Sequence, residues 1–296
     1  MNYERLFQNR YWLPKLGEIT LSSLQIALIS GVLLIPGMQS LSEPFKSVST
    51  IVNSGLFGHF LQSCHTYAGD LFLIALALHS VEYLLKRSFT AYHWKSWLWL
   101  VILLAVGVLT VFSGFLSMGN LESIEATQIM KHILKTAGAA GEVFFGFLLM
   151  SSQNNSTLSI LLHHVATFSI LTMVLTYMHL KRFKADVYAF YYTLVLIAFL
   201  ALLIPASIGS HPSAELAVVK GPWYFRGLQE MLAWMPAWLA GVAFPLSMLG
   251  LLAALPVWPQ RQNLVLKALA VLSIFYLIES FIATFFRGAG WQLNVW

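Results

Sequence analysis

The sequence predicts an all-α integral membrane protein with seven transmembrane helices. Of its 296 residues, 58% are hydrophobic and 10% are charged, a balance too apolar for an ordinary soluble domain. The mean hydropathy is +0.73, and several apolar runs approach the roughly 20 residues that a helix needs to cross a bilayer. The single cysteine, Cys64, excludes an intrachain disulfide. We attribute the net charge of +5 to membrane topology, and we infer no nucleic-acid partner from it.

Four apolar runs make up the first part of the chain. Their approximate bounds are 18–38, 57–85, 97–117 and 158–180. About 40 residues separate the third run from the fourth, which is long for a connection in a compact membrane protein. In this segment, apolar residues recur among charges at helical spacing from Leu121 onward. They predict an amphipathic helix on the membrane surface, followed by the polar linker SSQNNST.

Three further apolar runs follow, with approximate bounds 187–205, 238–255 and 264–286. Basic residues orient the spans, because cytoplasmic loops carry an excess of Lys and Arg. With the N-terminus in the cytoplasm, the cytoplasmic segments hold eleven of the seventeen basic residues: Arg5, Arg10, Lys15, Lys86, Arg87, Lys95, Lys181, Arg182, Lys184, Arg261 and Lys267. Spans two and four therefore both run from the outside inward.

Two pairs of histidines lie in spans two and four. His65 and His79 are fourteen positions apart, which places them about 21 Å apart along a helix and on nearly one face. His164 and His179 are fifteen apart, with about 22 Å of rise. Because the two spans run in the same direction, His65 would be level with His164, and His79 with His179. Neutral imidazole is a good axial ligand for haem iron, so the pattern predicts two bis-histidine haems.

Another explanation of these histidines stays open. Each could simply hydrogen-bond a neighbouring helix, since a membrane-embedded histidine needs a partner. His163 adjoins His164 and competes with it as a ligand, at sixteen residues from His179. The other histidines fall near the membrane surfaces, where solvated polar roles are expected: His59, His93, His132 and His211.

Glycines and carboxylates inside the spans are further candidates. Gly17 and Gly31 are also fourteen apart, and a glycine lets a bulky planar group approach a helix backbone. Asp70 lies within span two, and Glu279 lies within span seven. A carboxylate inside the membrane is a functional candidate by default. Either one could relay protons, or could be neutral or paired with a neighbouring helix.

The histidines and several short motifs together resemble the cytochrome b subunit of bc-type quinol oxidoreductases, over nearly the whole chain. Gly17, Gly31 and Gly114 match glycines of that family. The ATQI stretch from Ala126 resembles the surface helix beside the family's outer quinol pocket. GPWYF, at residues 221–225, resembles the family's PEWYF motif. The histidine intervals are similar to those of the b/f variety, whose four-span haem subunit is followed by a separate three-span subunit.

The resemblance implies that those two subunits are fused here. Residues 1–184 would be a four-helix di-haem cytochrome b domain, and residues 185–296 a three-helix domain that carries GPWYF. The implied cofactors are two haem b groups on the four histidines, and a quinone of unknown type near Pro222 and Trp223. Quinol would be oxidised on the outer side, and one electron would cross the membrane through the haems to an inner quinone.

The resemblance also implies partners and a location. Activity as a quinol:cytochrome c-type oxidoreductase would need a Rieske or other iron–sulfur protein, c-type cytochrome subunits, or both. The family is dimeric, which implies a homodimer within a larger complex. The expected location is a bacterial-type inner membrane, with a multi-pass chain and a cytoplasmic N-terminus.

The chain departs from the family at several positions. The motif glutamate, which takes a quinol proton in the family, aligns with Pro222, which cannot accept one. Glu230 is the first candidate to replace it, and weaker candidates are Tyr224, Glu122, Glu125 and His132. Arginines that pair with haem propionates in the family are replaced by Gln62 and Glu82. The cysteine for an extra covalent haem falls near Lys15, so no such haem is expected.

Two alternatives and one inner site stay open. The lost glutamate allows a Rieske-less complex, in which this di-haem subunit exchanges electrons with a multihaem cytochrome or an iron–sulfur partner. A transporter or haem-free anchor is the other alternative, although the sequence shows neither internal repeats nor a midplane polar site. Lys181, Lys184 and Asp186 suggest an inner quinone site, or alternatively a basic cluster that sets topology.

Overall fold

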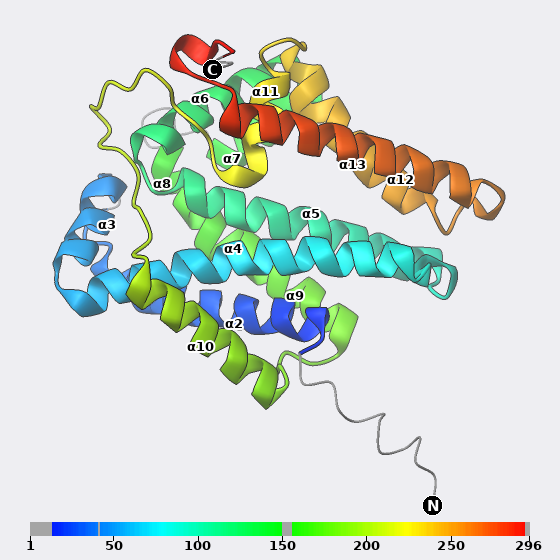
Figure 1. The fold of residues 1–296 in the computed structure, drawn as a ribbon, viewed down its shortest axis with the longest axis horizontal. Coiled ribbons are helices and arrows are strands. Elements are labelled where there is room, and N and C mark those ends of the chain that lie inside the picture. Colours follow the sequence, from blue (N-terminus) through cyan, green and yellow to red (C-terminus); the bar gives the residue numbers. More distant parts are fainter. Residues whose placement is uncertain (1–13, 41, 150–155, 294–296) are drawn as a thin grey trace, which may run out of the picture.

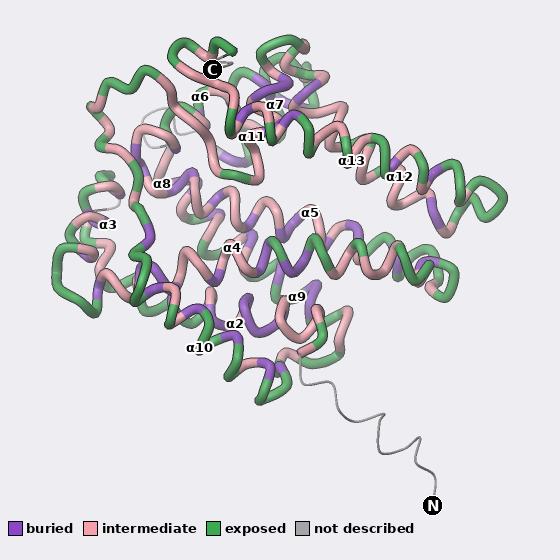
Figure 2. Tube along the Cα trace, viewed as in Figure 1, coloured by how far each residue is buried: buried purple, intermediate pink, exposed green. Residues whose placement is uncertain are grey.

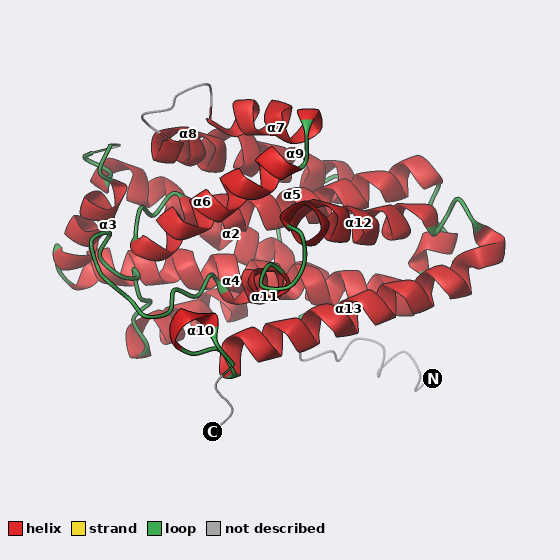
Figure 3. Ribbon diagram, turned by 90° about the horizontal axis from the view of Figure 1, so that it is seen from above, coloured by secondary structure: helices red, strands yellow, loops and turns green. Residues whose placement is uncertain are grey.

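The structure is a computed structural model that describes residues 14–40, 42–149 and 156–293. These residues form helices and loops, with one isolated antiparallel bridge between Arg287 and Leu293 (Figure 3). The α-helices are α2 (Leu16–Leu34), α3 (Pro44–Asn53), α4 (Leu56–Leu85), α5 (Trp94–Leu116), α6 (Leu121–Thr136), α7 (Ala139–Leu149), α8 (Ser156–Leu162), α9 (Ser169–Leu180), α10 (Val187–Leu203), α11 (Arg226–Met231), α12 (Phe244–Ala254) and α13 (Gln262–Phe285). The π-helical segments η3 (His163–Phe168) and η5 (Leu239–Ala243) precede α9 and α12, and the 3-10 turn η4 (Trp223–Phe225) precedes α11.

Five of the described helical segments are long and apolar enough to cross a membrane. They are Leu16–Gly37, Leu56–Leu85, Trp94–Leu116, Thr157–Leu180 and Pro259–Phe285, and they correspond to predicted spans one to four and seven. Spans five and six are the shorter apolar helices α10 and Leu239–Ala254. The 17 residues of α10 cover about 26 Å, slightly less than the roughly 30 Å of a hydrocarbon core. The predicted class, an all-α multi-pass membrane protein, is confirmed.

Helix α10 packs against α2 and α4. These two helices form the first group together with α5, η3 and α9. Ile197 and Ala201 of α10 share a buried core with Ile26 of α2 and with Cys64 and Ala68 of α4. Figure 1 shows α10 beside α2 and α4, on the side away from α12 and α13. The boundary between the two predicted domains stays a prediction, and in space α10 lies with the helices that carry the histidines.

The helices α11, α12 and α13 form a second group on the other side of α5 (Figure 1). Six buried residues join this group to α5 and to the turn before it: Phe89, Trp97, Val101, Leu255, Val265 and Leu269. The indole Nε1 of Trp97 donates to the carbonyl of Leu252 at 2.8 Å. A long segment without regular structure, residues 204–221, passes the end of the bundle where α3 lies and leads to α11 (Figure 1).

Two helices fill most of the segment between α5 and α8. Helix α6 begins at Leu121 as predicted, and the side chain of Asn120 caps it by accepting from Ser123 N at 2.8 Å. Helix α7, with the apolar sequence AAGEVFFGFLL, was not predicted. It is too short to cross a membrane, and it packs against α6 and α8 (Figure 3). The predicted polar linker lies mostly outside the described residues.

Large apolar side chains are exposed along α10 and α13, as helices that face lipid require. Leu202 of α10 is 70% exposed, and Leu277 of α13 is 66% exposed. Figure 2 shows many exposed positions on both helices, whereas buried positions are frequent on α2, α4 and α5. The buried, better-packed helices are those that carry or contact the predicted histidine ligands.

Candidate functional site

His65 of α4 and His164 of η3 face each other inside the first group of helices. Their ring centres are 6.2 Å apart, and the ring planes are inclined by 80°. Nδ1 of His65 lies 3.0 Å from the carbonyl oxygen of Ala27 on α2. Nδ1 of His164 lies 2.9 Å from the carbonyl oxygen of Thr110 on α5. Because a carbonyl only accepts, each Nδ1 carries the proton and donates, which leaves a free lone pair on Nε2 of both rings.

The two rings are held by the same local pattern on two different helices. Ser30 Oγ on α2 lies 3.2 Å from Nδ1 of His65. Ser113 Oγ on α5 lies 3.2 Å from Nδ1 of His164. Each serine stands three residues after the accepting carbonyl, one turn along the same helix face. The rings of His65 and His164 are therefore fixed in orientation and tautomer by their contacts with α2 and α5.

Glycines allow the histidine rings to reach these helices. A Cβ added at Gly31 or Gly114 would lie 3.0 or 2.8 Å from Cε1 of the histidine that the glycine faces. A Cβ at Gly17 would lie 3.1 Å from Cε1 of His79. All three predicted glycines thus contact a predicted ligand. Their role in admitting a bulky planar group stays a prediction.

The π-helical segment η3 separates His164 from its neighbour. A π turn inserts one residue into an α-helix and changes the direction of the side chains around it. His163 is 2% exposed, and both of its ring nitrogens have partners: Thr167 Oγ1 at 3.0 Å and the carbonyl of Phe147 at 2.9 Å. His163 therefore holds α7 against η3, and His164 is the residue that faces His65.

The second pair, His79 and His179, lies further along α4 and α9. The ring of Tyr83 contacts both, with its centre 4.7 Å from that of His79 and 6.3 Å from that of His179. Both histidines line one cavity between α4, α5, α9 and α12. Nδ1 of His79 lies 3.0 Å from a carboxylate oxygen of Glu82, which also pairs with Lys86. Glu82, at a position where the family has arginine, thus orients His79.

Both pairs fit the axial ligation of a haem iron. The donors are imidazoles, and the Nδ1 atoms of three of the four rings, His65, His79 and His164, have hydrogen-bond partners that fix the ring orientation, as metal-binding histidines require. A bond from imidazole nitrogen to a metal is about 2 Å long. Two such rings on opposite sides of one ion have centres about 6 Å apart, which matches the 6.2 Å between His65 and His164.

The GPWYF motif contacts both α4 and α5. The indole Nε1 of Trp223 donates to Oδ1 of Asp70 on α4 at 2.9 Å. The ring of Phe225 packs on Phe112 of α5, with 4.2 Å between ring centres. Phe112 is one residue before Ser113, so the motif touches the helix segment that holds His164. The structure therefore brings Trp223 and Asp70 together, two candidates that the sequence did not connect.

The backbone of Tyr224 is hydrogen-bonded to the second group of helices. The Tyr276 hydroxyl of α13 donates to the backbone carbonyl of Tyr224 at 2.6 Å. Burial, and then the nearby charge of Asp70, raise the pKa of the Tyr224 phenol well above its ordinary value. The phenol is therefore protonated over the physiological pH range. Pro222 stands immediately before η4, where it fixes the chain that enters the turn.

Glu230, the first candidate acceptor, is engaged in a buried ion pair. It is 2% exposed. Arg287 Nε donates to Glu230 Oε2 at 2.8 Å, and a terminal nitrogen of Arg287 donates to Oε1. Trp291 Nε1 donates to Oε2 at 3.2 Å. The hydrogen bonds to Glu230 raise the pKa of Arg287. Both carboxylate oxygens thus have donors, and a role for Glu230 in proton transfer stays a prediction.

The other three weaker candidates lie on α6. Burial alone would raise the pKa of Glu122, but hydrogen bonds from the amide and hydroxyl of Ser210 hold that pKa below its ordinary value. Glu122 thereby ties α6 to the loop that precedes the motif. Glu125 and His132 are exposed.

Local contacts account for some of the polar residues at the predicted inner quinone site. Asp186 Oδ1 accepts from the backbone nitrogens of Tyr188 and Ala189 at 3.0 and 3.1 Å, which makes Asp186 the N-cap of α10. Arg182 pairs with Glu18 of α2. These contacts tie the α9–α10 connection to α2. A quinone at Lys181 and Lys184 stays a prediction.

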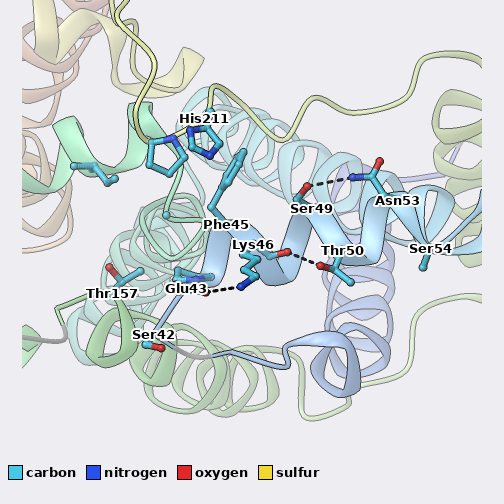
Figure 4. Close-up of a pocket in the computed structure, with 14 residues that line it drawn as sticks. Ser42, Glu43, Phe45, Lys46, Ser49, Thr50, Asn53, Ser54, Thr157 and His211 are labelled. Atoms are coloured by element: carbon cyan, nitrogen blue, oxygen red, sulfur yellow. Dashed lines mark hydrogen bonds and ion pairs between the residues drawn. The ribbon is translucent and has the colours of Figure 1, made fainter.

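A hollow of about 800 Å³ lies between α3, the start of α6 and the loop at His211 (Figure 4). Figure 4 shows that its side chains are largely polar and come mainly from α3. His211 packs edge-on against Phe45, and Glu43 pairs with Lys46 at 3.1 Å. Neither the four predicted haem ligands nor the GPWYF residues line this hollow.

A family model connects this geometry to known proteins. The model, described as Cytochrome b/b6/petB, matches residues 7–186, which is more than half of the chain and includes all four predicted ligands. The chain belongs to the cytochrome b family. Proteins of this family bind haem b, in agreement with the fit of the two histidine pairs. The resemblance predicted from the sequence motifs is confirmed.

Two individual proteins are similar to this cytochrome b over most of its length. Cytochrome b of Eptatretus burgeri is 22% identical over 321 residues, covering 95% of this chain and 82% of that protein. A solved structure described as "Hyperthermophilic respiratory Complex III" matches with a TM-score of 0.70 at 17% identity, covering 95% of this chain and 89% of the matched chain. This second likeness confirms the fold, including the C-terminal helices beyond the family match.

Proposed function

We propose that this cytochrome b is the haem-carrying, quinone-reactive subunit of a bc-type quinol oxidoreductase. His65 and His164 hold one haem b, and His79 and His179 hold a second. When bound, each haem supplies a reversible one-electron carrier with no open iron position for oxygen chemistry. The chain passes electrons between an outer quinone site at GPWYF and an inner quinone site near the other membrane surface.

The facing arrangement of His65 and His164 is the observation that carries the proposal. Both Nδ1 atoms donate to backbone carbonyls, so both Nε2 lone pairs are free for a metal between the rings. His79 lies about 21 Å further along α4. That distance is most of the roughly 30 Å hydrocarbon core, so two carriers at these levels support electron transfer across the membrane.

The proposed setting is a bacterial-type inner membrane with a cytoplasmic N-terminus. The moderate excess of Lys and Arg on one side supports this orientation. The proposed partners are a Rieske or other iron–sulfur protein, c-type cytochrome subunits, and a second copy of the chain. The similar solved structure, described as a respiratory Complex III, supports membership of a larger assembly.

Pro222 favours one alternative within the same chemistry. Without the motif glutamate, the subunit could serve a Rieske-less complex and exchange electrons with a multihaem cytochrome or another iron–sulfur module. Purification of the native complex distinguishes the two settings. A Rieske centre, detected by electron paramagnetic resonance, supports the first, and several covalently bound haems on one partner support the second.

Quinol-driven haem reduction tests the proposed function. Membranes that contain the native complex are oxidised and then given a short-chain quinol, while haem b absorbance is followed. The proposal predicts reduction of the haem b signal and its loss when the four histidines are replaced. Haem b that stays oxidised in the presence of quinol, in a preparation that dithionite reduces fully, would contradict it.

A further inference from the structure

Pro222 leaves the motif without a carboxylate, so a quinol proton needs another acceptor beside η4. Quinol oxidation releases protons with its electrons, and a positioned general base within hydrogen-bond reach accelerates such a transfer. Among the residues that the structure describes, one carboxylate is hydrogen-bonded to a motif side chain. It is Asp70, whose Oδ1 accepts from Trp223 Nε1 at 2.9 Å.

The position of Asp70 on α4 brings its side chain to the motif and not to the His65–His164 pair. It follows His65 by five residues, which is about 7.5 Å along the helix and about 140° around it. Among the described residues, Trp223 is the hydrogen-bond donor to Asp70, and its indole donates to Oδ1 of the carboxylate. Oδ2 is left for a substrate hydroxyl. Trp223 is 44% exposed, so the pair is accessible from outside the helix bundle.

Tyr224 completes the polar surroundings of this carboxylate. Its phenol is close enough for the charge of Asp70 to raise its pKa further, in addition to the effect of burial. A phenol that stays protonated can donate a hydrogen bond to a quinone oxygen but cannot take its proton. Of the two groups, Asp70 is therefore the one that can act as a base.

Two other candidate acceptors, Glu230 and Glu122, already accept hydrogen bonds on both carboxylate oxygens. Both oxygens of Glu230 accept from Arg287, and Trp291 adds a further hydrogen bond. Both oxygens of Glu122 accept from Ser210. Using either one as a base would mean breaking these contacts. Asp70 has one donor and one free oxygen.

We propose that Asp70 replaces the lost motif glutamate as the proton acceptor of the outer quinone site, and that Trp223 holds it in place. This inference rests on the proposed function. The O–H bond of one quinol hydroxyl breaks, and a new O–H bond forms on Asp70. The O–H bond of the second hydroxyl also breaks, and its proton passes to water, which reaches the pair from the exposed side of Trp223. The electrons leave the quinol one at a time to the acceptors named above, a haem and an external iron–sulfur or c-type cytochrome centre, and the quinol becomes quinone.

The test compares Asp70→Asn with Glu279→Gln in the native complex. Glu279 is a matched control, because it is also a carboxylate in a predicted span that accepts from an indole, Trp234 Nε1 at 3.1 Å. Asn and Gln keep an oxygen for the indole but remove the base. Quinol-driven haem reduction should slow about 100-fold in Asp70→Asn, a typical effect of losing a general base, and should stay near wild type in Glu279→Gln.

A second readout does not depend on turnover. Infrared difference spectra, recorded between the oxidised and the quinol-reduced complex, should contain a protonated-carboxyl band that shifts in deuterium oxide. The band should be absent in Asp70→Asn, present in Glu279→Gln, and shifted in Trp223→Phe, which removes the indole donor. Haem content and dithionite-reduced spectra show that each variant is assembled.

The outcomes separate this inference from the proposed function. If quinol does not reduce haem in the wild-type complex, the proposed function fails. If the wild type is active and Asp70→Asn keeps both its rate and the infrared band, the assignment of Asp70 is wrong while the function stands. Equal losses of rate in Asp70→Asn and Glu279→Gln would also overturn it, because the effect would then not be specific to the motif.

Discussion

Two glycines determine whether the rings of His65 and His164 can reach their carbonyl acceptors. We predict that Gly31→Ala and Gly114→Ala displace the facing histidine, because a Cβ would lie 3.0 and 2.8 Å from its Cε1. Overpacking of this kind costs about 1–3 kcal/mol. Haem content and redox titration of the purified complex should show that the haem of His65 and His164 is lost or altered while the haem of His79 and His179 is kept.

Gly69→Ala is the matched control for these variants. Gly69 is in the same helix as His65, and no atom lies within 4 Å of a Cβ placed there. Alanine is also a better helix former than glycine. Both haems should therefore be unchanged in Gly69→Ala, and an equal loss in all three variants would show that the glycines do not act through the histidines.

The motif itself gives a second prediction at the scale of single residues. If Asp70 stands in for the missing glutamate, a glutamate at position 222 should restore part of the quinol-driven rate to Asp70→Asn. Pro222 has extended backbone angles, φ −59° and ψ 151°, which glutamate also adopts. The rate of haem reduction in the Asp70→Asn, Pro222→Glu double variant should exceed that of Asp70→Asn alone. A further decrease would argue against a shared role.

At the scale of helices, Glu230 and Arg287 join α11 to the end of α13. The side chains of this pair are 3% and 13% exposed, so removing one partner leaves a buried charge without compensation. We predict that Glu230→Gln destabilises the C-terminal group by about 3–5 kcal/mol, measured as a lower unfolding temperature of the purified complex. The double replacement Glu230→Gln, Arg287→Gln should recover part of the loss.

The same variant distinguishes the two roles of Glu230. A structural role predicts lower stability with a near-normal quinol rate per assembled haem. Normal stability with a large loss of rate would instead support Glu230 as the proton acceptor that the sequence suggested. Stability and quinol rate, measured together, therefore distinguish Glu230 from Asp70 as the proton acceptor.

The helix positions were predictable from the sequence because apolar length and histidine spacing are local properties. Predicted spans two and seven agree with α4 and α13 to within two residues at each end. Helix α7 was missed because its eleven residues, although mostly apolar, are too few for a span and lack polar alternation. The π turn at η3 was also missed, so the sequence alone left the choice between His163 and His164 open.

Contacts between distant segments were the part of the site that the sequence could not supply. Asp70 and Trp223 are 153 positions apart, and their hydrogen bond depends on how η4 packs against α4. The carbonyls of Ala27 and Thr110 carry no sequence signal, because every residue has one. By contrast, Gly17 and Gly31 were identified beforehand, since residues without a side chain at a fixed helical interval are visible in the sequence, and Gly114 was identified through the family resemblance.

At the scale of the whole molecule, the GPWYF motif, the proposed quinone-reactive segment, lies where the second group of helices meets α4 and α5. The first group of helices, beside which α10 lies (Figure 1), carries the two histidine pairs. The turn η4, at the start of the second group, contacts α4 through Trp223 and α5 through Phe225. The family match ends at residue 186, before the GPWYF motif. Because none of the four proposed haem ligands lies in GPWYF, changes in the motif are expected to alter quinol chemistry while leaving haem ligation intact.

The central claim is that two histidine pairs hold two haems at different levels of one helix bundle. A pyridine haemochrome assay with a redox titration tests it most directly, on the wild-type complex and on His65→Ala and His179→Ala. We predict two b haems per chain with two separable potentials, and the loss of a different one in each variant. The absence of haem from the wild type, or the retention of both haems in both variants, would contradict it.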